Sequence, residues 1–308
     1  MKIAFLGTPE FAIPSLDMLV HSGHTLCVFT QPDRPVGRHA TLTPPPIKAY
    51  ALEHNIPVYQ FEKIRLPEGV SALKVFSPDL MVTAAFGQIL SAENLAIPKY
   101  GCINVHGSLL PKYRGAAPIQ WAIINGEHET GITTMLTDVG MDTGDILLTD
   151  RIAISDDVTA GELFDTLAVV GAETLNRTIL ALEAGTLTRT PQDEAQATKC
   201  PMLKKEHGKL EISESARNVH NRVRGTNPWP GAYAFLGGEP LKIHRTQMTD
   251  QTMECETPGL LRGNAKTGLF VCCSDGWLEI LELQATGGKR MLAKSFLAGC
   301  PLEGKVLS

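Results

Sequence analysis

The sequence predicts an α/β part with a Rossmann-like, mostly parallel sheet, followed by a small β-barrel. Three observations predict this. Short apolar runs without polar–apolar alternation are separated by segments of helical periodicity, which is typical of parallel strands covered on both faces. A polar stretch around residue 190 then breaks the pattern. Beyond it, short strands and turn signals follow one another closely, which favours an all-β domain.

The apolar runs of the first part predict strands at 2–7, 25–30, 80–87 and 102–106. After the first strand, Pro14 suits a first helical position and Gly23 marks the end of a helix. Residues 131–138 and 145–154 flank a glycine-rich turn, which predicts a hairpin added to the sheet. A long helix is expected from 159 to 184, where Gly185 ends the pattern.

The segment 186–203 is polar, contains two prolines and has no period of 2.0 or 3.6 residues. Such a composition is typical of a linker. We therefore predict an α/β domain over 1–188, a linker over 189–203 and a C-terminal domain over 204–308. In that last domain a short helix over 213–224 precedes strands separated by glycine- and asparagine-containing turns.

Composition narrows the class of protein. No apolar run of 18 residues is present, so no transmembrane helix is expected. The apolar run at the start of the chain is too short for the core of a signal peptide. The seven cysteines are scattered and form no C-x-x-C pair. We therefore expect a cytoplasmic protein with reduced thiols and with neither a zinc site nor a disulfide framework.

Charge is distributed unevenly along the chain. Residues 1–203 contain 14 Lys and Arg against 22 Asp and Glu, whereas residues 204–308 contain 14 against 11. The net charge of −5 therefore conceals a basic C-terminal third. This asymmetry is a hint of an anionic partner that docks on the C-terminal part.

Common nucleotide motifs are absent. Gly7 alone stands where a dinucleotide fingerprint would need three glycines, so no nicotinamide cofactor is indicated. The stretch 31–48 contains five prolines together with Arg34 and Arg38. A loop of this length is either functional, for instance as a phosphate contact, or a solvated surface loop.

The motif "NVHGSLLP" contains the first candidate site. Asn104 and His106 are two residues apart, so in a strand they face the same side, at the carboxyl end where open α/β sheets bind ligands. An amide N–H and an imidazole N–H that converge can stabilise an oxyanion. The alternative is a buried pair that satisfies nearby loop carbonyls.

A second motif, "DVGMDTGDIL", supplies carboxylates in the predicted hairpin turn. Asp138, Asp142 and Asp145 lie around two glycines that permit a tight turn. One carboxylate near the imidazole would fix its tautomer. The acids could instead bind a metal or be solvated, but no His or Cys ligands accompany them.

Taken together, "GTPEFA", "QPDRPVGR", "INVHGSLLPKYRGAAPIQWAI", "TTMLTDVGMDTGDIL" and "RGTNPWPGAYAF" resemble the methionyl-tRNA formyltransferase family. The resemblance runs in order from Lys2 to about Ala234 and continues more weakly to the end. It implies a formyltransferase domain, an OB-like C-terminal barrel, and formyl transfer from 10-formyltetrahydrofolate to the α-amine of initiator methionyl-tRNA.

Site residues follow from the same resemblance. Asn104, His106 and Asp142 match the family's catalytic trio, and Ser108, Leu109, Leu110 and Pro111 match the segment that lines the tetrahydrofolate site. Arg38 falls at the position of the family's tRNA-contacting loop, so the resemblance implies a tRNA contact there. No metal is expected to take part in the chemistry.

Further tRNA contacts are expected in the basic C-terminal third. The candidates are Lys204, Lys205, Lys209, Arg217, Arg222 and Arg224. Lys112 and Arg114 could face the tRNA or solvent. We expect a monomer without membrane contact. Rival readings are a formyltransferase for a nucleotide-linked amino sugar, a formyltetrahydrofolate hydrolase and a non-catalytic RNA-binding module.

Overall fold

The computed structural model describes residues 1–37, 40–250, 254–255 and 257–308. The chain forms two compact units. The first comprises Met1–Gly115, Thr130–Ile152 and Phe164–Lys199, and the second comprises Ala116–Glu129, Ala153–Leu163 and Cys200–Ser308. Each unit contains three separate segments of the chain, so no single boundary in the sequence divides them. Within the second unit, helix α5 (Pro118–Ile124) packs on helix α7 (Ala216–Gly225), which joins an early segment to the C-terminal residues.

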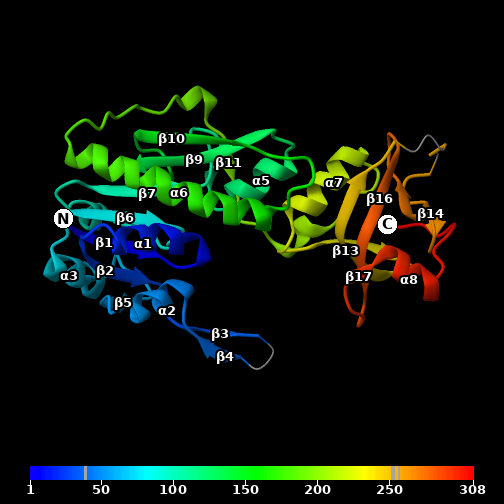
Figure 1. The fold of residues 1–308 in the computed structure, drawn as a ribbon, viewed down its shortest axis with the longest axis horizontal. Helices are drawn as coiled ribbons and strands as arrows, with labels where there is room; N and C mark the ends of the chain where they lie inside the picture. Colours follow the sequence, from blue (N-terminus) through cyan, green and yellow to red (C-terminus); the bar gives the residue numbers. More distant parts are fainter. Residues whose placement is uncertain (38–39, 251–253, 256) are drawn as a thin grey trace. The chain divides into compact units, whose positions relative to one another are not determined.

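A seven-stranded sheet with the order β10-β9-β7-β6-β1-β2-β5 forms the centre of the first unit (Figure 1). Its parallel strands are β1 (Lys2–Gly7), β2 (Thr25–Thr30), β5 (Val58–Gln60), β6 (Leu80–Ala84) and β7 (Cys102–His106). Strand β9 (Glu129–Leu136) runs antiparallel to β7, and β10 (Ile146–Ala153) lies at the edge. The four predicted strands and the hairpin are confirmed, whereas the edge strand β5 was not predicted.

Helices cover both faces of this sheet. On one face, the helix α6 (Ala160–Glu183) packs so closely that a Cβ added at Gly171 would lie 3.0 Å from Cγ1 of Val105 in β7. On the other face, Ala4 and Leu6 pack with Leu73 of α3 (Pro67–Phe76). The long helix predicted over 159–184 is α6, and its bounds are confirmed to within a residue at each end. The shorter elements are η1 (Glu10–Ala12), α1 (Ile13–Val20), α2 (Pro46–Glu53), α4 (Ala92–Leu95), β8 (Arg114–Gly115), η2 (Glu194–Gln196) and β11 (Lys199–Cys200).

The proline-rich stretch 31–48 is not simply a loop. Its strands β3 (Arg34–Val36) and β4 (Thr41–Thr43) pair antiparallel, with Arg34 opposite Thr43. The guanidinium of Arg34 donates two hydrogen bonds to the carboxylate of Glu62. Arg38 lies outside the described residues.

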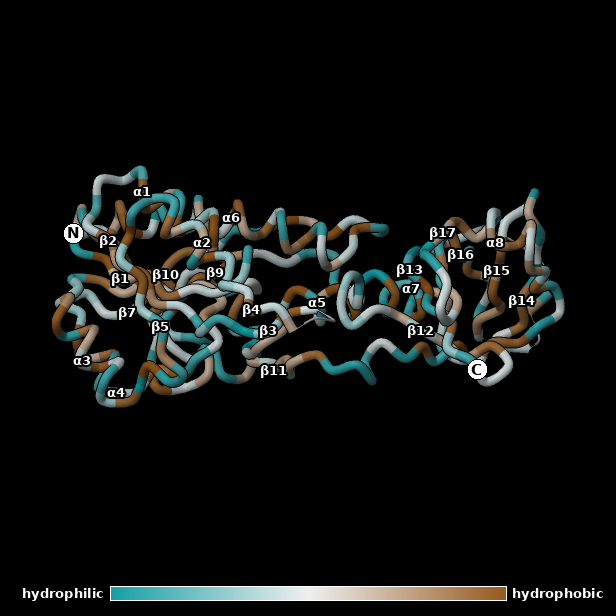
Figure 2. The backbone as a smooth tube through the Cα atoms, turned by 90° about the horizontal axis from the view of Figure 1, so that it is seen from below, coloured by the Kyte–Doolittle hydropathy of each residue, from teal (hydrophilic) through white to brown (hydrophobic). Residues whose placement is uncertain are grey.

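The second unit is an antiparallel β domain with the strand order β12-β13-β16-β15-β14, and β17 pairs with β16. Bridges from Leu307 to Leu236 and from Val306 to Leu260 connect the two edges through the last residues of the chain, which closes the sheet as expected for a barrel. Strand β15 is buried along its whole length and is mostly hydrophobic (Figure 2). The elements are η3 (Lys205–Gly208), β12 (Ala232–Leu236), β13 (Glu239–Met248), β14 (Leu261–Asn264), β15 (Gly268–Cys272), β16 (Trp277–Ala285), β17 (Met291–Leu292) and α8 (Ala293–Gly299).

The cysteines differ from expectation, because Cys255 and Cys272 form a disulfide with a Cα–Cα distance of 5.5 Å. The prediction that all seven are thiols was wrong. Spacing did not reveal the pair, since the contact arises in the fold: Gly259 and Leu260 exchange backbone hydrogen bonds with Cys272 and thereby bring the preceding chain beside it. In the described part of the chain, no helix has the length and apolar character needed to cross a membrane.

Candidate active site

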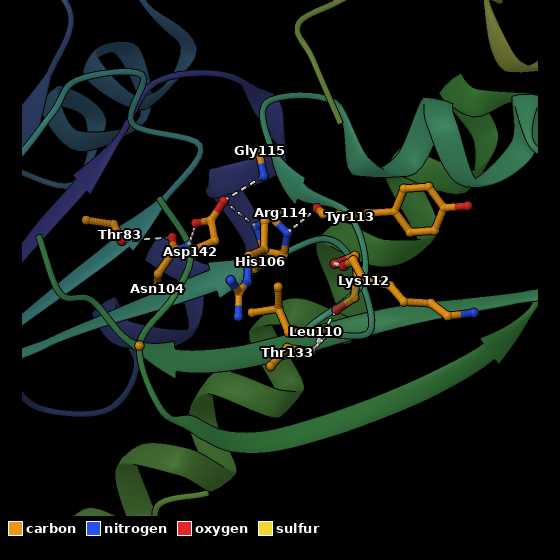
Figure 3. A network of polar contacts seen from close by, with 12 residues as sticks. Thr83, Asn104, His106, Leu110, Lys112, Tyr113, Arg114, Gly115, Thr133 and Asp142 are labelled. Atoms are coloured by element: carbon orange, nitrogen blue, oxygen red, sulfur yellow. Dashed lines mark hydrogen bonds and ion pairs between the residues drawn. The ribbon is translucent and has the colours of Figure 1, made fainter. Parts of the chain in front are cut away.

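Asn104 and His106 lie at the carboxyl end of β7, near the middle of the sheet (Figure 3). Asn104 is in register with Thr83 of β6 on one side and Met135 of β9 on the other. Because the two residues are two apart in a strand, their side chains share a face. Here the parallel strands β6 and β7 end, so the side chains lie where open sheets present ligand-binding groups.

The Asn104 amide has a defined orientation. The hydroxyl of Thr83 donates to Oδ1 of Asn104 at 2.8 Å, which leaves the amide N–H₂ on the opposite side. That group points toward Oδ1 of Asp142 over a long 3.4 Å. A donor held in place by its oxygen but only weakly engaged through its hydrogens is available to a developing negative charge.

The His106 ring is buried, and its two nitrogens have different environments. Nε2 lies 2.9 Å from the backbone oxygen of Tyr113. A carbonyl can only accept, so Nε2 carries a hydrogen. Nδ1 faces Oδ2 of Asp142 at 3.7 Å. In the neutral ring Nδ1 therefore offers a lone pair, which differs from the expectation of an N–H aimed at an oxyanion. The hydrogen bond to Tyr113 also agrees in part with the alternative interpretation, in which the buried histidine satisfies a loop carbonyl.

Of the three acids in the predicted turn, Asp142 is the one that faces the Asn/His pair. Its Oδ2 accepts the backbone N–H of Gly115 at 2.9 Å. Asp138 instead accepts hydrogen bonds from Gly140 N and from the Thr143 hydroxyl, and so shapes the turn. A Cβ at Gly144 would lie only 1.7 Å from the oxygen of Leu136, so this position requires glycine. The three predicted side chains are brought together by this turn.

The segment 108–111 is fixed to β9. Ser108 is fully buried; its hydroxyl donates to the Lys112 oxygen at 2.7 Å, and its carbonyl accepts from the Thr133 hydroxyl at 2.7 Å. Leu110 is buried as well, and its N–H donates to Thr133 Oγ1. Leu109 and Pro111 remain partly exposed. These two are therefore the members of the segment whose side chains can contact a ligand, whereas Ser108 and Leu110 hold the segment in shape.

The basic candidates of the second unit occupy different environments. Lys204 and Lys209 are exposed and pair with Glu206 and Glu211, respectively. Lys205 is exposed, Arg222 is partly exposed, and Arg217 pairs with Asp156. Arg224 is only 5% exposed, and its guanidinium donates to Asn221 Oδ1 and to the oxygens of Ser155 and Val158. The expectation that Arg224 contacts tRNA conflicts with this burial. The hydrogen bonds of the Arg224 side chain lie within the second unit.

Lys112 and Arg114, which follow the segment 108–111, also lie in different environments. The Lys112 side chain is exposed and extends away from Asp142 (Figure 3). Arg114 is 4% exposed and forms a two-point ion pair with Glu194. Hydrogen bonding to that carboxylate raises the pKa of Arg114. Arg114 therefore does not face an incoming tRNA.

Sequence reasoning missed three groups of the site: the Thr83 hydroxyl, the Tyr113 carbonyl and the Gly115 N–H. The last two are backbone groups, which no residue pattern identifies. Cys102 begins the same strand, but burial raises the pKa of its thiol to about 12, so it stays protonated. Among the described residues, no three His, Cys, Asp or Glu side chains are grouped to hold a metal ion.

Comparison with known proteins identifies the family. The formyl transferase family matches residues 1–179, and the formyl transferase C-terminal domain family matches residues 202–301. The methionyl-tRNA formyltransferase of Acetivibrio thermocellus is 53% identical over 309 aligned residues that cover 100% of this chain and 99% of the relative. That of Geobacter metallireducens is 50% identical and covers 98% of this chain and 97% of the relative.

Solved structures share the fold at much lower identity. A sugar 3N-formyltransferase in the presence of dTDP and 5-N-formyl-THF has a TM-score of 0.71 at 18% identity, covering 94% of this chain and 99% of that one. HypX of Aquifex aeolicus in complex with tetrahydrofolic acid has a TM-score of 0.67 at 15% identity, over 99% of this chain and 48% of that one. At these identities the match shows the fold alone. The full-length identity of about one half identifies the chain as a member of the methionyl-tRNA formyltransferase family.

Proposed function

We propose that this protein transfers the formyl group of 10-formyltetrahydrofolate to the α-amine of initiator methionyl-tRNA. The observation that carries the proposal is the cluster of Asn104, His106 and Asp142 at the carboxyl end of β7 in a chain about half identical to methionyl-tRNA formyltransferases over its full length. The reaction forms a bond from the amine nitrogen to the formyl carbon and breaks the bond from that carbon to N10 of the folate.

Asn104 supports the reaction as an oxyanion donor. When the amine attacks, negative charge develops on the formyl oxygen. The amide N–H₂ of Asn104, oriented through Thr83, can donate to that oxygen without rearranging first. Such preorganised donors typically contribute about 10²–10³ in rate.

His106 and Asp142 support the proton movement. Since Nε2 already donates to Tyr113, Nδ1 is the nitrogen that can accept the proton of the attacking amine. Asp142, fixed by the Gly115 N–H, would hold the resulting imidazolium. The same Nδ1–H can then protonate N10 as the bond to the formyl carbon breaks. Each proton taken up is thereby returned, and the residues end in their starting state.

The folate donor would contact Leu109 and Pro111, the two partly exposed residues of the segment beside His106. The buried Ser108 and Leu110 fit a supporting role, because their polar groups are engaged with Lys112 and Thr133. For the tRNA we propose contacts by Lys204, Lys205, Lys209, Arg217 and Arg222, and by Arg38 in the proline-rich segment. A substrate used in translation initiation places the protein in the cytoplasm.

The second candidate is formyl transfer to a nucleotide-linked amino sugar, which is favoured by the fold shared with the sugar 3N-formyltransferase. One assay separates the two functions and also hydrolysis. Labelled 10-formyltetrahydrofolate is supplied with methionyl-tRNA, with an amino-sugar nucleotide, or alone. We expect label on the methionyl amine. Label on the sugar, or free labelled formate at a comparable rate without an acceptor, would overturn the proposal.

A further inference from the structure

Gln192 follows α6 in the sequence and belongs to the predicted linker 189–203, yet its side chain holds the Asp142 turn of the first unit. Its Nε2 donates to the backbone oxygen of Asp142 at 2.8 Å and to that of Gly144 at 2.7 Å. Its Oε1 accepts from Nε of Arg114 at 2.9 Å. The amide thus joins the Asp142 turn to Arg114, which follows the segment 108–111 in the sequence.

Chemistry fixes the orientation of this amide. The two carbonyl oxygens can only accept, and Arg114 Nε can only donate. Exchanging the oxygen and nitrogen of the Gln192 amide would break all three hydrogen bonds at once. The side chain therefore has one productive orientation, and each of its polar atoms is used.

Arg114 makes this connection rigid. Its Nη1 and Nη2 donate to the two carboxylate oxygens of Glu194 at 2.9 and 2.7 Å. Its backbone N–H donates to the Thr198 oxygen at 2.9 Å. The next residue, Gly115, provides the N–H that binds the Asp142 carboxylate. Asp142 is therefore held at two points. Gln192 binds its backbone oxygen, and Gly115, next to Arg114, binds its carboxylate. The hydrogen bond between Gln192 and Arg114 connects these two points.

Asp142 needs such support because its backbone is in the left-handed region, at φ +54°. For a residue other than glycine this conformation costs on the order of 1 kcal/mol. The turn is also exposed at Val139 and Met141, which are 78% and 70% exposed, so packing by its own side chains does little to hold it. Hydrogen bonds from Gln192 to the oxygens on either side of Thr143 supply the restraint.

We propose that Gln192 is a positioning residue for Asp142 in formyl transfer. This inference rests on the proposed function and deepens it. Gln192 does not reach the reacting atoms. It keeps the Asp142 carboxylate opposite Nδ1 of His106, and its loss should lower the rate of the chemical step while substrate binding is retained.

The test uses two substitutions in the full-length protein. Gln192→Glu can still accept from Arg114 but has no N–H for the turn, and Gln192→Met removes all three bonds at similar length. We expect kcat to fall about 10- to 100-fold, as for a misplaced catalytic group, with KM for methionyl-tRNA and for 10-formyltetrahydrofolate within about threefold. Gln196→Met is the matched control, because Gln196 is an exposed glutamine of the same segment and its amide donates to the exposed carboxylate of Asp193.

The decisive measurement is a double-mutant cycle in single-turnover assays. If Gln192 acts through Asp142, the effect of Gln192→Glu should largely disappear in the Asp142→Asn background. There the substitution should lower the single-turnover rate by less than about threefold. Amide exchange at Gly115 gives a readout independent of activity, and it should accelerate in Gln192→Glu. Near-normal kcat in both variants, an equal loss in the Asp142→Asn background, or unchanged exchange at Gly115 would each overturn the inference. A wild-type protein that fails to formylate methionyl-tRNA would instead overturn the proposed function.

Discussion

The hydroxyl of Thr83 donates to Oδ1 of Asn104 at 2.8 Å, and this bond decides which end of the Asn104 amide faces Asp142. Thr83 lies on the neighbouring strand β6, in register with Asn104. Two parallel strands therefore cooperate: one carries the proposed oxyanion donor, and the other selects its orientation.

Replacing Thr83 by Val should release the Asn104 amide while leaving the packing nearly unchanged. A hydrogen bond of this kind contributes about 0.5–1.5 kcal/mol, which corresponds to roughly a 2- to 12-fold loss of kcat. Thr83→Ser keeps the hydroxyl and should retain activity close to that of the wild type. Single-turnover formylation rates of the two variants measure the effect. Equal rates in Thr83→Val and wild type would show that the orientation of Asn104 does not depend on this bond.

Asn104→Ala and His106→Ala should each lower kcat by about 10²–10³, the usual effect of removing one preorganised group. Binding of tetrahydrofolate, measured by calorimetry, should persist, because Leu109 and Pro111 are unaffected. Near-normal turnover in both variants would refute the assignment of the site. The ¹⁵N shifts of His106 in the wild type provide a separate check, since the bond to Tyr113 requires the Nε2–H tautomer in the neutral ring.

Much of the fold could be predicted from the sequence, because its signals are local. The strands at 2–7 and 102–106 are short, mostly apolar runs, and α6 ends at Glu183, just before Gly185. The spacing of Asn104 and His106 likewise sets the face of a strand. Such features depend on neighbours along the chain and need no knowledge of the tertiary structure.

The groups that complete the site are of a different kind. Tyr113 and Gly115 contribute backbone atoms, so their residue types carry no signal. Gln192 acts across 50 residues of sequence, from a stretch whose composition is that of a linker. Arg114 and Arg224 were expected on the surface because arginine is rarely buried without a partner. Their partners, Glu194 and Asn221, become evident only in the folded chain.

The Cys255–Cys272 disulfide predicts a measurable contribution to stability. It closes a loop across a separation of 17 residues, for which the loss of chain entropy in the unfolded state corresponds to about 3 kcal/mol. Protein purified without reductant and alkylated in denaturant should leave these two cysteines unmodified. Its urea midpoint should fall when reductant is added. Cys300→Ser, a partly exposed cysteine outside the pair, is the control. Alkylation of all seven cysteines would show that the pair is not formed.

Electrostatic docking of tRNA predicts a steep dependence on salt. Each phosphate contact contributes about 0.9 to the slope of log affinity against log salt concentration. Lys204→Ala combined with Lys205→Ala should raise KM for methionyl-tRNA and reduce that slope by roughly one or two units. Lys74→Ala, an exposed lysine of the first unit that pairs with Glu93, should leave the slope unchanged. A flat dependence of KM on ionic strength in the wild type would contradict the proposed contacts.

His220 predicts how the stability of the second unit responds to pH. The ring is buried, with Nδ1 beside the Thr246 hydroxyl and Nε2 beside the Asp156 oxygen. Burial lowers the pKa of His220 below its usual 6.5; the hydrogen bond to Asp156 opposes this shift in part. The unfolded chain therefore binds the proton more readily than the folded one. Stability should be constant above pH 6.5 and should fall as the pH drops from about 6.5 toward the folded-state pKa.

His220→Gln removes this titration, so its unfolding free energy should depend less steeply on pH between 6.5 and 5. Urea denaturation followed by tryptophan fluorescence isolates the effect, because Trp121, Trp229 and Trp277 all belong to the second unit. His244 is also partly buried with a lowered pKa and contributes a background slope, so the comparison is between variants rather than with zero. His54→Gln, at an exposed position of the first unit, should keep the wild-type slope. An equal slope in His220→Gln and wild type would mean that the buried ring does not control this transition.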